Sequence, residues 1–189
     1  DEEEQELLDK LLTCTPGLFE QSAKDCERAK KILRSQAFYD IDQLEWATHC
    51  LHQTMTLISL AYYPAQICFP PIETDIVYKP FMSSEIIESL DDDQINVYRD
   101  VFTMLIQPVM ENERPAMVGI SVVQQKQLIP TFTFCKMIKE KFPETHITLG
   151  GNIITRIRDM LPEKENLWEL FDSAIVYEGE SAYLKLTEA

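Results

Sequence analysis

Three apolar runs in the second half of the chain each end in residues that can contact a polar ligand. Ser121 lies near the end of the first run, Gly150-Gly151-Asn152 follow the second, and Glu178-Gly179-Glu180 follow the third. Adjacent glycines let a backbone approach a flat or phosphate-bearing group closely. If the runs are parallel strands, these residues meet at the edge where open α/β sheets bind their ligands. The pattern therefore predicts a ligand pocket at this edge, with a tight turn that binds nothing as the alternative.

Cysteine and histidine spacing gives no support for a metal or redox site. His49 and His52 can share one helix face, but they are not accompanied by a recognisable zinc ligand set. The cysteines are odd in number and contain neither a CxxC pair nor a CxxxCxxC cluster motif, so we expect free thiols in a reducing compartment. They are Cys14, Cys26, Cys50, Cys68 and Cys135.

Catalytic and nucleotide-binding motifs are also missing from the sequence. Neither GxGxxG nor GxxxxGK[ST] occurs, so NAD and nucleoside triphosphates are not favoured as ligands. Glu178 and Glu180 form a carboxylate pair near the predicted edge, but acidic residues at a helix start more often complement the helix dipole than act as general acids. We therefore predict no catalytic residue in this chain.

The elements that must position the edge residues alternate between strand and helix. The predicted strands are Met117–Val122, which we expect to be buried on both faces, His146–Leu149 and Ala174–Tyr177. Such β-α-β-α-β-α alternation is typical of a parallel sheet covered by helices, that is, an α/β fold. The predicted helices are Leu128–Phe142, Ile154–Leu161, Leu167–Phe171 and a last one that begins near Glu180.

The first half of the chain shows helical rather than strand periodicity. The acidic run Asp91-Asp92-Asp93 is predicted to be a solvated loop, and Pro108 is predicted to kink the helix that follows this loop. Prolines at 64, 70, 71 and 80 leave room for one short extended piece around Asp75–Tyr78. The predicted helices are Leu18–Gln36, Ile41–Tyr62 with Asp40 as its cap, Ser83–Leu90, and one marked by apolar residues from Tyr98 to Val109.

Charge and glycine content divide the 189-residue chain near Pro115. Residues 1–115 carry a net charge of −13 and one glycine, whereas residues 116–189 carry −2 and four glycines. We therefore predict an acidic, mostly helical region over 1–115 and an α/β region over 116–189. The total charge of −15 disfavours nucleic acid and anionic membranes as partners, because phosphates are bound by Lys and Arg.

Composition places the chain in the soluble, globular class. The hydrophobic fraction of 45% is ordinary, and no apolar run approaches the roughly 18 residues of a membrane span. The opening Asp1-Glu2-Glu3-Glu4 is unlike the positively charged start of a secretory signal. The sequence thus predicts a cytoplasmic protein.

Four segments of the second half follow one another in a recognisable order and spacing. The segments are Val118-Gly119-Ile120-Ser121-Val122, Met137–Pro143, Ile147-Thr148-Leu149-Gly150-Gly151 and Ala174-Ile175-Val176-Tyr177-Glu178-Gly179-Glu180. In this order and spacing they resemble the cobalamin-binding domain of B12-dependent radical SAM enzymes. The resemblance covers residues 115–189, about 40% of the chain, and the acidic first half is similar to an insertion that some members carry within this domain.

The resemblance implies a partial flavodoxin-like sheet with helices on both faces and a role for each edge residue. It implies that the domain holds cobalamin for a radical SAM domain of the same polypeptide, which would carry S-adenosylmethionine and the 4Fe-4S cluster. The parent enzyme would be a methyltransferase, a tetrapyrrole-type cyclase or a peptide-modifying enzyme. By position, the resemblance implies that Ser121 and Val122 line the slot for the nucleotide tail of cobalamin. Gly150, Gly151 and Asn152 would lie close to the phosphate and ribose of that tail. Tyr177, Glu178 and Gly179 would form the opposite wall of the slot.

The chain departs from the family pattern in two respects. The DxHxxG motif is missing, because His146 does not satisfy it and lies inside a predicted strand, so no histidine of this chain is expected below the cobalt. A flavodoxin-like sheet also needs about five strands, and two of them are expected to precede residue 1. Two alternatives remain open: a degenerate domain of the same fold that only docks a partner, and an independent enzyme that uses the Gly150-Gly151 edge.

Overall fold

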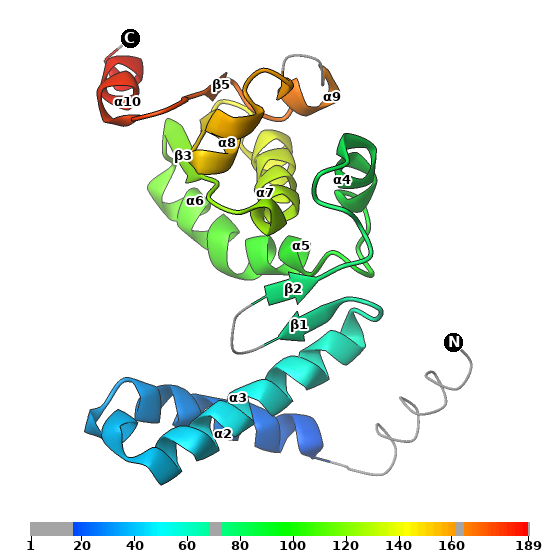
Figure 1. The fold of residues 1–189 in the computed structure, drawn as a ribbon, viewed down its shortest axis with the longest axis vertical. Helices are drawn as coiled ribbons and strands as arrows, with labels where there is room; N and C mark the ends of the chain where they lie inside the picture. The colour runs from blue at the N-terminus through cyan, green and yellow to red at the C-terminus, as the bar shows by residue number, and fades with distance from the viewer. Residues whose placement is uncertain (1–16, 69–72, 162–164, 189) are drawn as a thin grey trace. The chain divides into compact units, whose positions relative to one another are not determined.

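The computed structural model describes residues 17–68, 73–161 and 165–188, and the chain divides into two compact units (Figure 1). The first unit is Asp1–Ile76 and the second is Val77–Ala189. The division predicted near residue 115 marks a change of composition inside the second unit. That residues 1–115 form one insertion-like region remains a prediction.

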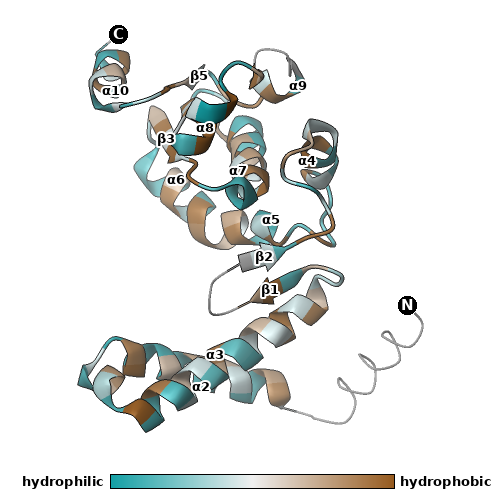
Figure 2. Cartoon of the chain, viewed as in Figure 1, coloured by the Kyte–Doolittle hydropathy of each residue, from teal (hydrophilic) through white to brown (hydrophobic). Residues whose placement is uncertain are grey.

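The first unit is built around a pair of helices, as the sequence predicted. Helix α2 spans Leu18–Leu33, a short 3-10 helix η1 spans Gln36–Tyr39, and α3 spans Ile41–Ala61. The Asp40 carboxylate accepts the N–H groups of Asp42 and Gln43, both at 3.1 Å, and so caps α3. Hydrophilic and hydrophobic residues are interspersed along α2 (Figure 2), and its buried residues Ala29 and Ile32 are three positions apart, as on one face of a helix.

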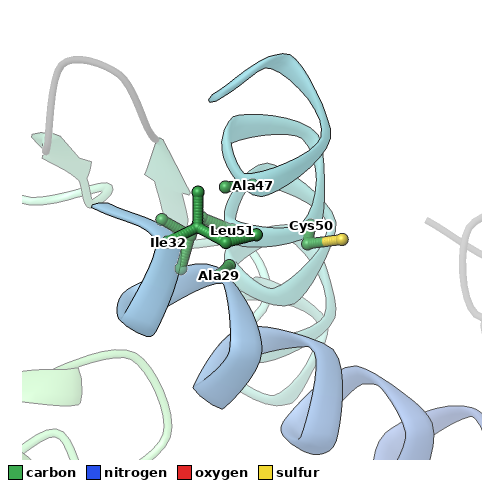
Figure 3. Close-up of a cluster of buried hydrophobic side chains, with 5 residues drawn as sticks. All are labelled: Ala29, Ile32, Ala47, Cys50 and Leu51. Atoms are coloured by element: carbon green, nitrogen blue, oxygen red, sulfur yellow. The ribbon is translucent and has the colours of Figure 1, made fainter. Parts of the chain in front are cut away.

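Three of the five buried side chains between α2 and α3 are small (Figure 3). Leu51 and Ile32 are the largest of them, and the half-buried Trp46 packs at the margin with the Arg28 guanidinium 4.3 Å from its ring centroid. Burial raises the pKa of the Cys50 thiol. The cluster consists of Ala29, Ile32, Ala47, Cys50 and Leu51.

A β-hairpin follows α3, and its position corrects the prediction of an extended piece at 75–78. Strands β1 (Gln66–Cys68) and β2 (Glu73–Asp75) pair antiparallel, with Gln66 opposite Asp75. The Ile67 N–H donates to the Ser59 hydroxyl at 2.7 Å, which ties β1 to the end of α3. This tertiary hydrogen bond has no counterpart in the local sequence pattern, so the strands could not be placed from periodicity.

The second unit begins with helices that the sequence predicted in outline. They are α4 (Ser83–Ser89), α5 (Val97–Val101), a π-helical turn η2 (Phe102–Ile106) and α6 (Gln107–Glu113). The π turn ends just before Pro108, which has no N–H to donate and would clash with the carbonyl of a regular preceding turn. The wider turn therefore accommodates the proline within an otherwise continuous helical segment.

The remainder of the second unit contains a three-stranded parallel sheet in the order β3-β4-β5. This establishes the mixed α/β character that the alternation predicted. In chain order the elements are β3 (Met117–Ser121), η3 (Gln125–Gln127), α7 (Leu128–Lys141), β4 (His146–Gly150), α8 (Asn152–Ile157), α9 (Glu165–Trp168), β5 (Ser173–Ala174) and α10 (Glu180–Thr187).

Two details of the sheet differ from the sequence prediction. The third strand is two residues long rather than Ala174–Tyr177, although the Ile175 N–H still donates to the Leu149 carbonyl at 2.8 Å. The strand β3 is only half-buried, whereas Ile147, Thr148 and Leu149 at the centre of β4 are all buried. The difference follows from strand order, because in the described part of the chain only β4 has a neighbour on both sides.

A buried polar network joins the helices of residues 77–115 to α7. The Asn96 amide, 1% exposed, donates to the Ser89 carbonyl at 2.8 Å and to the Thr133 hydroxyl at 2.9 Å. Its side-chain oxygen accepts the Tyr98 N–H and caps α5. Because a buried amide must find hydrogen-bond partners, this network specifies how α4, α5 and α7 pack.

The acidic run at 91–93 lies at the surface, as the prediction of a solvated loop requires, but each of its carboxylates has a partner. Asp91 pairs with Lys136 and Asp93 with Arg99. Asp92 accepts the Tyr78 hydroxyl at 2.8 Å, and this hydrogen bond raises the pKa of Tyr78 to about 12. The run therefore anchors a turn, and the repulsion between its like charges is offset by these contacts.

Candidate functional site

The predicted edge residues of β3 and β4 do come together at the carboxyl ends of their strands. Ser121 lies opposite Gly150 in the parallel register. The Val122 N–H donates to the Gly150 carbonyl at 2.8 Å, and the Val122 carbonyl accepts the Ile153 N–H at 3.0 Å. The backbone groups of Val122 are thus used within the protein, and its side chain is fully buried.

Gly151 is required by close backbone packing. Its φ of +98° lies in the region that favours glycine, and an added Cβ would stand 2.6 Å from the Val122 carbonyl oxygen. Val122 and not a ligand therefore occupies the space that the missing side chain leaves. Gly150 is less constrained, since an added Cβ would meet only the Ile175 carbonyl oxygen, at 3.7 Å.

The third predicted segment lies beside α8. The Tyr177 N–H donates to the Thr155 hydroxyl at 2.9 Å, and Tyr177 has a φ of +63° and a ring that is 68% exposed. The Arg158 guanidinium lies 5.3 Å from the centroid of that ring. Tyr177 and Arg158 together place an aromatic ring and a cation near the edge. The sequence analysis identified neither Thr155 nor Arg158, although both follow Asn152 at intervals of three residues.

Several polar side chains at the edge are exposed and lack a hydrogen-bond partner within the described residues. They include Ser121, at the end of β3, and Asn152, the first residue of α8. Glu178 is exposed as well, and Gly179 immediately precedes α10, with its would-be Cβ 3.2 Å from Ile175. An exposed hydroxyl and an exposed amide can hydrogen-bond to a phosphate or ribose.

One residue that the sequence analysis did not identify packs beside the middle of β3. Tyr183 of α10 packs on β3, with its ring 3.2 Å from the position of a Cβ on Gly119. The glycine thus makes room for an aromatic ring of the protein itself. Nothing in the local sequence around Gly119 signals this contact, because the two residues are 64 positions apart.

His146 lies away from this edge, as predicted, and the other two histidines belong to the first unit. His49 and His52 are in α3, and His146 begins β4 at the opposite end of the strand. Within the described residues no group of three or more His, Cys, Asp or Glu side chains is arranged to hold a metal ion.

A polar cluster ties the start of β4 to β5. The His146 Nε2 and the Ser173 hydroxyl are 2.9 Å apart. Asp172 accepts the Ile147 N–H at 2.6 Å and pairs with Lys139 at 2.6 Å. Burial opposes ionisation of Asp172, but the hydrogen bonds from Lys139 and Ile147 outweigh it and lower the pKa of the carboxyl. The arrangement is a cross-strand connection that fixes the register of β4 and β5.

The lining of two pockets of the second unit includes none of the eight predicted edge residues. One, of about 540 Å³, lies at the amino ends of β3 and β4 between Arg114 and Glu144. The other, of about 470 Å³, is lined by helices α4, α7, α8 and α9. In the described part of the chain, no helix is long and apolar enough to cross a membrane.

No protein-family model matches the chain, and neither a curated protein nor a solved structure shows a significant match to it. The function must therefore be argued from the residues and their geometry.

Proposed function

We propose that the unit Val77–Ala189 is a cofactor-binding domain of the cobalamin-binding type, which holds the nucleotide tail of cobalamin at the carboxyl ends of β3, β4 and β5. The observation that carries the proposal is the meeting of Ser121, Gly150 and Asn152 at one edge of a parallel sheet. Ligands of open parallel sheets bind at this edge.

The edge offers groups that suit the polar part of the tail. The exposed Ser121 hydroxyl and Asn152 amide would donate hydrogen bonds to its phosphate or ribose. Arg158, held over the ring of Tyr177, would supply a positive charge beside the phosphodiester. Val122, being fully buried, would support the edge from below. Cobalamin would bring the cobalt chemistry, while this chain would bind and orient it for a radical SAM domain of the same polypeptide.

A specific observation favours a second candidate, a domain of the same fold that docks a partner and binds no cofactor. The face of Gly119 is covered by Tyr183, and the space beside Gly151 is filled by the backbone of Val122. The aromatic base of the cobalamin nucleotide tail would need open space next to small residues at this edge. Under the docking proposal, Tyr183 occupies the space where that base would otherwise lie.

Titration with hydroxocobalamin separates the two candidates. The full chain is mixed with the cofactor, its visible spectrum is recorded, and co-elution is measured by gel filtration. The Ser121→Trp variant blocks the edge at an exposed position, and His146→Ala is the matched control at the opposite end of the sheet. Circular dichroism checks that each variant is folded.

The cofactor proposal expects co-elution with wild type and with His146→Ala, and loss of co-elution with Ser121→Trp. It also expects an unchanged spectrum of the bound cofactor in alanine variants of His49, His52 and His146, because no histidine would contact the cobalt. The absence of co-elution from a well-folded wild type rejects it. The docking candidate then gains support if Tyr183→Ala binds the cofactor that wild type refuses.

A further inference from the structure

The second unit contains an apolar pocket whose lining includes none of the residues assigned to the strand edge. Its volume is about 470 Å³, within the range of roughly 300–1,000 Å³ that is usual for small-molecule sites. The helices α4, α7, α8 and α9 that line it are grouped in one part of the unit (Figure 1). Its floor is formed by buried side chains, each no more than 5% exposed: Ile86, Leu128, Phe132, Ile153, Leu161 and Leu167.

The rim of the pocket carries large apolar side chains that remain exposed to solvent. Phe81 is 67% exposed, Met82 is 42% exposed and Met160 is 59% exposed. Exposed apolar groups clustered around a cavity are typical of a binding site, because their surface can be covered by a bound molecule. The unbranched methionine side chains can adapt to ligands of different shape.

The polar groups at the rim are few, and their own hydrogen-bonding capacity is free. Ser83, Ser84 and Gln125 line the pocket, and none of their side chains has a hydrogen-bond partner in the part of the chain that the structure describes. Among the described residues that line the pocket, Arg156 is the one cation. It has no ion pair with a described residue, although the chain carries 32 carboxylates.

A guanidinium that has no ion pair among the described residues and lies beside an apolar cavity selects a ligand for its charge as well as for its hydrophobicity. In helix α8 the isoleucines and Arg156 occupy neighbouring positions, so hydrophobic and hydrophilic residues adjoin (Figure 2). Arginine recognises carboxylates through paired N–H donors. A neutral ligand would leave this capacity unused, and a cation would be repelled.

We propose that this pocket binds a small amphipathic carboxylate, whose aliphatic body fills the cavity and whose carboxylate pairs with Arg156. The juxtaposition that carries the proposal is an apolar cavity with an exposed methionine and phenylalanine rim and an arginine that has no ion pair among the described residues. The inference does not depend on cobalamin binding, because the pocket includes none of the residues assigned to the strand edge.

The test uses the full chain and dodecanoate below its micelle concentration, with dodecanol as the uncharged probe. Isothermal titration calorimetry measures affinity for wild type and for Arg156→Gln. Lys185→Gln is the control for loss of a positive charge, since Lys185 is on α10 and does not line the pocket. Methyl NMR of the methionines reports the location, with Met82 and Met160 as pocket probes and the exposed Met104 of the π turn as the internal control.

The expected result is saturable binding of dodecanoate that shifts the Met82 and Met160 signals and leaves Met104 unchanged. Arg156→Gln should weaken dodecanoate binding by about tenfold, the loss of one charge-assisted pair, and leave dodecanol binding unaltered. Lys185→Gln should change neither.

Three outcomes would overturn the proposal. The first is no saturable binding of dodecanoate to the folded wild type. The second is equal affinity for dodecanoate in wild type and Arg156→Gln. The third is self-association of the wild-type chain that a pocket-filling Ser84→Trp variant abolishes, because it would assign the pocket to a second copy of the chain.

Discussion

The helical pair of the first unit and the α/β unit bury their helices in different ways. Between α2 and α3 the buried side chains are mostly small, and each helix has one buried stripe. Helix α7 instead has buried residues on most of its circumference, including Phe132 and Thr133. A helix that packs on several neighbours needs hydrogen-bond partners for its polar side chains as well as apolar contacts.

The comparison teaches that the same helical periodicity can belong to two kinds of core. A two-helix core of small residues gains little from any one side chain, because little apolar area is removed from water. A core that also contains a sheet and a polar network gains more from each large side chain, and it tolerates substitution less well. Four substitutions in the full chain test this difference.

The largest effect is expected for Phe132→Ala. The ring is fully buried and lies 6.3 Å, centroid to centroid, from Phe171. Its removal should lower the free energy of unfolding by about 3–5 kcal/mol. Hydrogen exchange read by mass spectrometry should show faster exchange over residues 77–188 and unchanged exchange in α2 and α3. Equal acceleration in both units would refute the idea of separate cores.

Leu51→Ala should have a smaller effect, of about 2–3 kcal/mol. Leu51 is 6% exposed and packs against α2 in a cluster of small residues that can close partly around the cavity. Faster exchange should be confined to residues 18–61. A loss larger than that of Phe132→Ala would reverse the ranking of the two cores.

Asn96→Ala should cost about 1–3 kcal/mol, because it leaves the buried Ser89 carbonyl and the Thr133 hydroxyl short of a donor. The matched control is Asn112→Ala, which removes an exposed amide from α6 and is expected to change the stability very little. Thermal unfolding followed by circular dichroism measures both variants. A neutral Asn96→Ala variant would show that the network is dispensable for packing.

The smallest effect is expected for Asp172→Asn and is seen only in the pH dependence of stability. The folded-state pKa of Asp172 is lowered, so the ion pair with Lys139 stabilises the fold above the ordinary carboxyl pKa and is lost as the pH falls through the folded-state value. For a partly exposed pair the contribution at neutral pH is about 0–1 kcal/mol. Denaturant unfolding at pH 7 and pH 3 should show a smaller acid-induced loss in the variant than in wild type. An equal loss in the two proteins would mean that the pair contributes nothing to stability.

Strands β3 and β4 and helix α7 were predictable because their apolar patterns are strong. The run from Met117 to Val122 and the run from His146 to Leu149 could be recognised as strands, and the glycine pair after the second located the edge. The hairpin of β1 and β2 and the short β5 were not predicted correctly, since their pairing depends on hydrogen bonds to Ser59 and Leu149 that lie outside each segment.

Sequence alone determined which residues could meet at the strand edge, because parallel strands bring their carboxyl ends together. It also determined the acidic character of the first 115 residues and the absence of clustered metal-ligand motifs. Only the tertiary structure decided that Tyr183 covers Gly119, that Val122 occupies the space beside Gly151, and that Asp91, Asp92 and Asp93 are paired. Those contacts depend on how the chain folds back on itself, and a local pattern of hydrophobicity carries no information about them.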